Sequence, residues 1–202
     1  MLTPKSPEEL KQMALHAVPP SHLSSGHPLL DEFLDGGLRW GELSEWGMPW
    51  GQSLRDVILW FLIRAQQAEP CWILWIYGQP DISINPLAWQ ARGLDLNWIR
   101  FARAQQPLHE LKPVFLSPFF CIIVIDAPQR LADDDCAFLA RQARRQQQML
   151  IILRPHALSP GRGNVWAKMR VNCWHDLQQQ RIFAKIVKGR RPRQIMWPIP
   201  TF

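Results

Sequence analysis

A short glycine-bounded segment contains the residues whose types and spacing come nearest to a phosphate-binding site. Residues 47–53 read Gly-Met-Pro-Trp-Gly-Gln-Ser and join a strand-like run, 42–46, to a helix-like run, 52–64. In the P-loop pattern G-x-x-x-x-G-K-[ST], backbone N–H groups at a helix N-terminus bind phosphate oxygens, and the lysine contacts the β- and γ-phosphates. The segment here is one residue shorter and has Gln52 where the lysine would stand. It therefore predicts a degenerate nucleotide site.

Hydrolysis of ATP needs further groups, and only some of them are present. Ser53 retains a hydroxyl at the magnesium-ligand position, and Asp126 ends a buried apolar run, where a second magnesium ligand is expected. An aspartate after a strand also commonly caps the next helix, which is the structural interpretation of Asp126. The carboxylate that orients water is missing, because Gly78-Gln79-Pro80 stands at its position and Asp81 is the nearest acid.

Loss of the cation that faces the triphosphate weakens both nucleotide binding and transition-state stabilisation. We therefore expect no catalytic residues, no resident metal and no cofactor, with binding of magnesium-ATP as the alternative. The residues of this weak nucleotide site are Gly47, Gly51, Gln52, Ser53 and Asp126.

Positive charge is concentrated at the C-terminal end of the chain. The formal net charge is +6, and no Asp or Glu follows Asp176. The cations in this part lie beside Phe183 and Trp197 and suit the phosphates of a nucleic acid or an acidic protein surface. The alternative is a solvated edge strand whose charges prevent edge-to-edge pairing. The predicted contact residues are Arg181, Lys185, Lys188, Arg190, Arg191 and Arg193.

Composition and cysteine spacing exclude several classes of protein. The chain has 202 residues, enough for one domain with a substantial apolar core. Its four cysteines are far apart and show no C-x-x-C pair, which argues against a zinc site or a disulfide framework. Residues 1–19 lack the apolar stretch of a signal peptide, and no apolar run approaches the roughly 18 residues of a membrane span. We therefore expect a cytoplasmic protein with no membrane contact.

The elements that must position these residues alternate along the middle of the chain. Apolar runs typical of strands buried on both faces alternate with helical runs, which predicts an α/β fold with a mainly parallel sheet and helices on both faces. The predicted strands are 42–46, 71–77, 99–102, 119–125 and 149–153, and the predicted helices are 53–67, 86–92 and 133–147. Two further strands, 166–174 and 182–187, predict a C-terminal antiparallel hairpin at the sheet edge.

The chain divides into three parts where its composition changes. Residues 1–23 hold a capping box, a short helix and a Pro-rich linker, where we expect a segment that docks on a partner. Residues 24–188 form the α/β domain, and residues 189–202 form a basic tail that contains Pro and Trp.

The residues around the glycine-bounded segment resemble the core of the RecA/RadA recombinases. Residues 25–34 read Ser-Gly-His-Pro-Leu-Leu-Asp-Glu-Phe-Leu, and Gly36-Gly37-Leu38 and the run Gly-Glu-Leu-Ser-Glu-Trp-Gly at 41–47 follow. This order is similar to the T-G-x-x-x-L-D-x-x-L-x-G-G stretch before the family's phosphate loop. Asn85-Pro86 and residues 91–95 are similar to the segment after the family's second strand, and residues 122–126 stand at its Walker B position. The resemblance covers residues 24–153 and implies a RecA-like fold.

Departures from the recombinase pattern point to a narrower group. The loop lysine and the glutamate after the second strand are missing, and the chain between Asp126 and residue 149 has no room for the first DNA-binding loop. This short form without the lysine resembles the ImuA family, as residues 186–192 also do, and more distantly the SulA cell-division inhibitors.

The ImuA resemblance implies a non-catalytic adaptor, a pseudo-ATPase, in SOS-induced translesion DNA synthesis, DNA repair and mutagenesis after DNA damage. The partners that it implies are an ImuB-like polymerase-related protein, RecA and an error-prone replicative-type polymerase, with DNA contacted through the basic tail. Two alternatives stay open. One is a divergent ATPase whose cation comes from Arg55 or Arg154, and the other is a SulA-like inhibitor that binds FtsZ.

Overall fold

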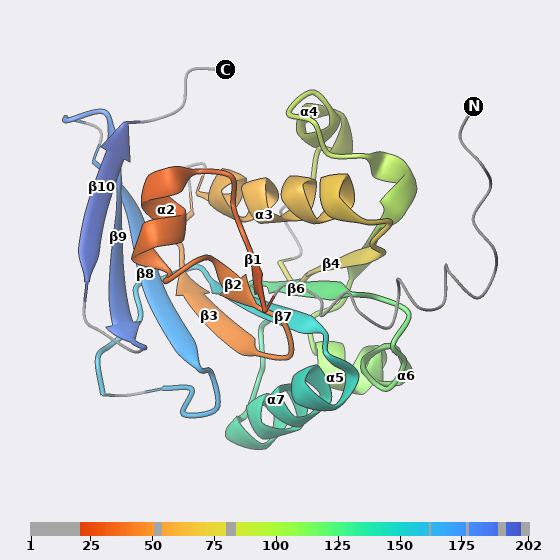
Figure 1. Ribbon diagram of the computed structural model, residues 1–202. Coiled ribbons are helices and arrows are strands. Elements are labelled where there is room, and N and C mark those ends of the chain that lie inside the picture. The colour runs from red at the N-terminus through yellow and green to blue at the C-terminus, as the bar shows by residue number, and fades with distance from the viewer. Residues whose placement is uncertain are drawn as a thin grey trace, which may run out of the picture.

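An eight-stranded mixed sheet forms the centre of the molecule (Figure 1). The computed structural model describes residues 21–50, 54–79, 84–161, 163–176, 178–189 and 193–198. Within these residues the strand order is β10-β9-β8-β3-β7-β6-β4-β5, and the neighbouring strands from β8 to β5 are all parallel. The parallel strands are β3 (Leu43–Gly47), β4 (Ile73–Tyr77), β5 (Ile99–Arg103), β6 (Ile122–Asp126), β7 (Met149–Arg154) and β8 (Met169–Asp176).

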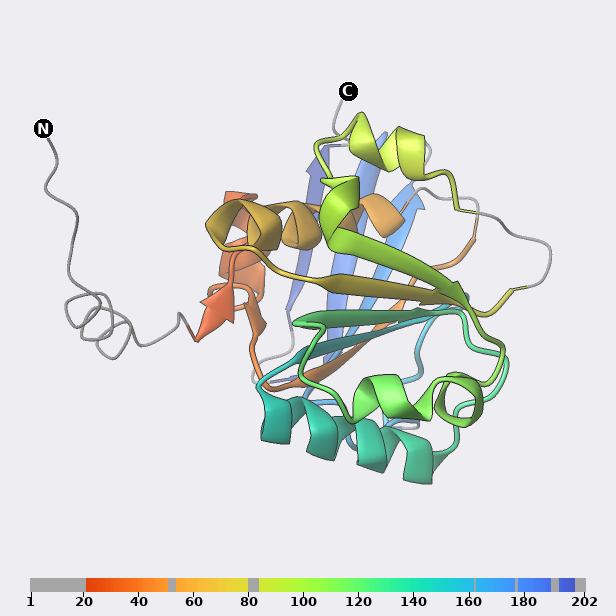
Figure 2. The same cartoon turned by 90° about the vertical axis from the view of Figure 1, so that its right-hand side faces the viewer.

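The central strands read as continuous apolar runs because helices cover both of their faces. Figure 2 shows α3 and α4 on one face of the sheet and α5, α6 and α7 on the other. These observations confirm the predicted α/β fold with a mainly parallel sheet and helices on both faces. The helices are α2 (Pro28–Phe33), α3 (Arg55–Ala68), α4 (Pro86–Gln90), α5 (Pro107–Glu110), α6 (Lys112–Phe115) and α7 (Asp133–Gln146), with a 3₁₀ turn, η1 (Leu96–Trp98).

The two long helices follow from local sequence. In α3, Val57, Phe61 and Ala65 recur every four residues and are buried, which places one stripe of the helix against the sheet. In α7, three aspartates occupy the first turn, and Arg144 and Arg145 occupy the last. The charges at both ends therefore interact favourably with the helix dipole and stabilise the helix.

Three C-terminal strands extend the sheet beyond α5, α6 and α7, while their other face packs against α2 and α3. β9 (Arg181–Lys188) pairs antiparallel with β8, and β10 (Gln194–Pro198) pairs antiparallel with β9 at the sheet edge. The predicted antiparallel hairpin is therefore confirmed. Its first strand, β8, is also a parallel neighbour of β3, so the hairpin continues the main sheet.

The remaining described elements lie near the start of the domain. β1 (His22–Leu23) and β2 (Leu38–Arg39) pair with each other and enclose α2 in the chain. The helix predicted in residues 1–17 lies outside the described residues. In the described part of the chain, no helix is both long and apolar enough to cross a bilayer.

Candidate functional site

Asp126 lies at the carboxyl end of β6, on the face of the sheet that α3 covers. The residue is 5% exposed. β6 runs between β4 and β7, and Val124, two residues earlier on the same face, belongs to the core cluster around α3. The first turn of α3 lies next to Asp126, because its first residue, Arg55, contacts the Asp126 carboxylate. The sheet topology thus brings together two segments 71 residues apart.

Arg55, the first residue of α3, is the direct partner of Asp126. Its Nη2 donates to Asp126 Oδ1 over 2.8 Å, and its Nε lies 3.4 Å from Oδ2. Its Nη1 donates to the Met48 carbonyl oxygen over 2.8 Å. The guanidinium carbon lies 3.8 Å from the centroid of the Trp50 ring, at a distance typical of a cation–π contact. The N–H groups of the guanidinium thus bind the carboxylate and the Met48 carbonyl oxygen, and its planar face packs on the Trp50 ring.

This ion pair sets the electrostatics of the site. Burial raises the pKa of the Asp126 carboxyl above its ordinary value, and the charge of Arg55 acts in the opposite direction. Magnesium requires oxygen ligands in a near-octahedral arrangement. An ion at Asp126 would have to displace the guanidinium from the carboxylate oxygens. In the described part of the site, Arg55 thus already occupies the carboxylate that would hold a metal ion.

Gly47 has a structural reason to be glycine. A Cβ atom at this position would lie 2.8 Å from the His156 carbonyl oxygen and would also overlap Asn172 Oδ1. Asn172 is held in place because its side chain accepts from the Leu158 N–H over 2.6 Å and donates to the Leu158 carbonyl oxygen over 2.9 Å. Close packing of the end of β3 against β8 and the loop after β7 thus accounts for this glycine. The other loop residues predicted for the site, Gly51, Gln52 and Ser53, lie outside the described residues.

A second buried ion cluster, which the sequence interpretation missed, lies on the opposite face of the sheet. Glu45 in β3 is 2% exposed and accepts from Arg154 Nε over 2.9 Å and from Arg170 Nε over 2.8 Å. Arg154 ends β7 and Arg170 is in β8, the two strands that flank β3. The signal for this cluster was an acid, Glu45, between Leu43 and Trp46 in a predicted strand. Arg154, one cation considered for a divergent ATPase, is therefore on the other face from Asp126.

The predicted basic residues that the structure describes do not form one patch. Arg181 and Lys185 are exposed on β9. Lys188 Nζ donates to the Val165 carbonyl oxygen, and burial together with nearby Arg170 lowers the pKa of Lys188. Arg193 Nη1 lies 2.9 Å from Asp35 Oδ1 and links the start of β10 to the α2 region. The predicted residues Arg190 and Arg191 lie outside the described part of the chain.

The aromatic neighbours of the cations also differ from the expectation. Trp197 is 1% exposed and packs on the face of the sheet that α2 and α3 cover. Its ring centroid lies 5.9 Å from that of His27 and 6.4 Å from that of Trp60. Phe183 instead stacks on Trp174 of β8, with a centroid distance of 5.4 Å and an interplanar angle of 9°. Trp174 was not selected from the sequence because it precedes the basic run.

Chemically, the pair of Arg55 and Asp126 fastens the first turn of α3 to the end of β6. No cluster of three His, Cys, Asp or Glu side chains suited to a metal ion occurs among the residues that the structure describes. The chain matches no protein-family model, and a search of curated proteins returns no match.

Proposed function

We propose that the protein is a non-catalytic RecA-like adaptor of SOS-induced translesion DNA synthesis, as its ImuA-like sequence features imply. The observation that carries the non-catalytic part is the 2.8 Å contact between Arg55 Nη2 and Asp126 Oδ1. This contact places the Arg55 cation at the carboxylate that would bind a metal. At the position of the lysine that would face the phosphates, the chain has the neutral Gln52.

The physical reason is competition for one carboxylate. A buried charge is stabilised only by a partner of opposite sign, and Arg55 already supplies that partner without a ligand. Magnesium would add two positive charges next to a guanidinium that has other contacts, at the Met48 carbonyl and the Trp50 ring, holding it in place. Binding of magnesium-ATP therefore has to overcome both the repulsion and the loss of these contacts.

The adaptor part of the proposal concerns partners. We expect an ImuB-like polymerase-related protein as the direct partner, with RecA and an error-prone replicative-type polymerase in the same assembly. The features that support surface-mediated action are the exposed cations of β9 and the extension of the sheet beyond α5, α6 and α7.

Isothermal titration calorimetry with magnesium-ATP tests the non-catalytic part. The wild-type protein is expected to bind with a millimolar or weaker Kd and to release no phosphate in a parallel assay. The divergent ATPase is the competing function, favoured by the position of Arg55 on the first turn of α3. It requires micromolar binding with turnover, both lost in Arg55→Met. The matched control is Arg64→Met on the exposed side of the same helix.

Affinity capture from cells with damaged DNA tests the adaptor part. We expect recovery of a polymerase-like protein, and deletion of the protein should reduce damage-induced mutagenesis. Filamentation on overproduction, without any effect on mutagenesis, would instead select the SulA-like function. Recovery of neither class, with normal mutagenesis in the deletion, would refute the adaptor.

A further inference from the structure

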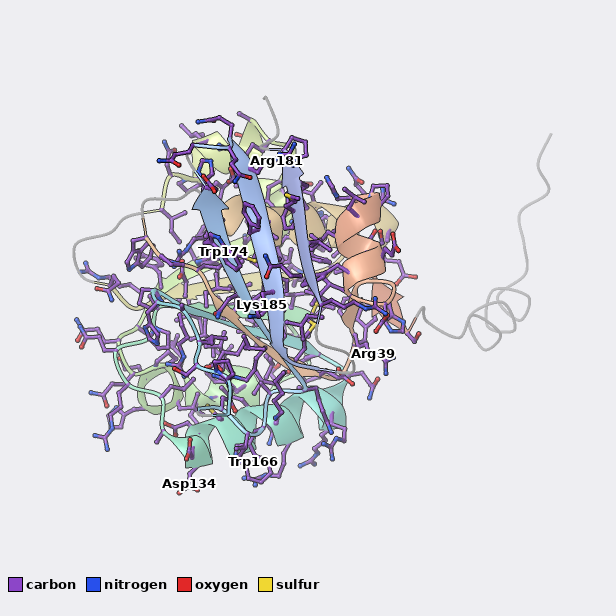
Figure 3. All side chains as sticks on the ribbon, turned by 90° about the vertical axis from the view of Figure 1, so that its left-hand side faces the viewer. Arg39, Asp134, Trp166, Trp174, Arg181 and Lys185 are labelled. Atoms are coloured by element: carbon purple, nitrogen blue, oxygen red, sulfur yellow. The ribbon has the colours of Figure 1, made fainter. Side chains whose placement is uncertain are left out.

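Among the residues that the structure describes, no helix covers one face of the strands β8, β9 and β10. On β9, Arg181, Phe183 and Lys185 alternate toward this face, while Ile182 and Ala184 between them are buried on the side of α2 and α3. Figure 3 shows Trp174, Arg181 and Lys185 on these strands, with no helix between them and the viewer. We call this surface the open face.

An aromatic pair lies at the centre of the open face. Phe183 is the cross-strand neighbour of Trp174 on one side and of Met196 on the other. The rings of Trp174 and Phe183 are nearly parallel, both side chains are partly exposed, and Met196 is 48% exposed. Edge strands are commonly protected by charged side chains, but β9 lies between β8 and β10, so edge protection does not account for its cations. Protection of the edge does not require exposed apolar rings, so these need another explanation.

Cations lie on both sides of the aromatic pair along β9. Arg181 precedes Phe183 by two residues and Lys185 follows it by two, so the cations are about 13 Å apart at the usual rise of a strand. Both side chains are exposed. Arg181 Nη1 lies 3.2 Å from Met196 Sδ, and this contact does not neutralise the guanidinium charge because the thioether is uncharged. Asp176, the cross-strand neighbour of Arg181 on β8, places one carboxylate at this end of the face, where it accepts from the N–H groups of Gln178 and Gln179. The face therefore offers π-surfaces between Arg181 and Lys185, with an acidic group beside Arg181.

From this arrangement we infer that the open face binds single-stranded DNA, with bases stacked on Trp174 and Phe183 and phosphates on Arg181 and Lys185. Stacking on a sheet surface and charge along the backbone are the two usual components of single-strand recognition. In a duplex the base faces are already stacked on each other, so the aromatic pair favours single strands. The inference rests on the proposed function for its setting, because an adaptor in translesion synthesis works where single strands are exposed.

Fluorescence anisotropy of the full-length protein with a labelled oligothymidylate of about 20 nucleotides tests the inference. We expect tighter binding of this probe than of a labelled duplex of equal length. Trp174→Leu and Phe183→Leu should each weaken binding by about fivefold or more at every salt concentration, because they remove a stacking surface. Arg181→Gln and Lys185→Gln should each reduce the slope of log Kd against log salt by about 0.7.

Matched controls place the same changes elsewhere. Phe119→Leu alters a side chain that is 54% exposed before β6, and Arg141→Gln removes an exposed charge from α7. Both should bind the probe as the wild type does. If Phe183→Leu impairs folding, Met196→Glu is used in its place. Position 196 is exposed, so the glutamate places a negative charge beside the aromatic pair without disturbing the core. It should weaken binding at low salt, and circular dichroism checks that each variant is folded.

Three results would overturn the inference: no binding at low salt, equal affinity for single strand and duplex, or aromatic variants that bind as the wild type does. The assay contains no nucleotide. If the oligonucleotide does not bind, the calorimetric result with magnesium-ATP is unaffected. Conversely, turnover of ATP would refute the non-catalytic function but would not affect the assignment of the open face as a single-strand site.

Discussion

Replacing Arg55 by methionine should destabilise the protein in a pH-dependent way. Asp126 is 5% exposed, and the side chain of Arg55 is 12% exposed, so the pair is largely desolvated. Breaking a buried ion pair by removing one partner costs about 3–5 kcal/mol. The partial exposure of Arg55 favours the lower end, and we expect a loss of about 3 kcal/mol in the free energy of unfolding near neutral pH.

The pH dependence follows from the proton affinity of Asp126. Burial already raises the pKa of this carboxyl, and Arg55 opposes that shift, so Arg55→Met should raise the pKa further. With a pKa above that of the unfolded chain, about 3.9, the folded variant takes up a proton as the pH falls. The penalty is then relieved by about 1.4 kcal/mol for each unit by which the pKa exceeds the pH. Contacts with Met48 and Trp50 are lost at every pH and leave a constant remainder.

Urea unfolding followed by circular dichroism at about pH 8 and about pH 5 measures this effect as a difference from the wild type. Arg64→Met, on the exposed side of the same helix, is the control and should change stability by less than about 0.5 kcal/mol at both pH values. A penalty for Arg55→Met that is equal at the two pH values, or grows in acid, would refute the account of Asp126 as a buried charge compensated by Arg55.

Two further predictions concern β3 and its neighbours. Gly47→Ala should lower the free energy of unfolding by about 1–3 kcal/mol, because the added Cβ overlaps Asn172, and an unchanged urea midpoint would show that the packing yields easily. Glu45→Gln should lower the free energy of unfolding by about 3–5 kcal/mol, because Arg154 and Arg170 then have no buried counter-charge between them. Thermal unfolding measures this loss, and a decrease in Tm no larger than that of an exposed substitution would contradict it.

Local sequence patterns were sufficient for the central strands and the two long helices, but not for β10, which lies in the segment 189–202 that was predicted as a tail. The apolar run at 71–77 contains β4, the run at 149–153 covers all but the last residue of β7, and the helical run 53–67 covers all but the last residue of α3. These patterns succeed because burial on both faces, or on one stripe, is a property of the run itself. The missing lysine at position 52 is likewise visible without coordinates, since it depends on the order of residues in one loop.

Side-chain partners across the sheet were decided only by the tertiary structure. Arg55 and Asp126 are 71 residues apart, and Arg170 is 125 residues from Glu45. Each pair depends on strand order and register, which no local period encodes, because a shift of one residue turns a side chain to the other face. The same register placed Trp174 on Phe183 and put Trp197 in the core. The sequence thus determined that the glycine-bounded segment has glutamine where the P-loop pattern has lysine, whereas long-range pairing decided where the remaining charges and rings lie.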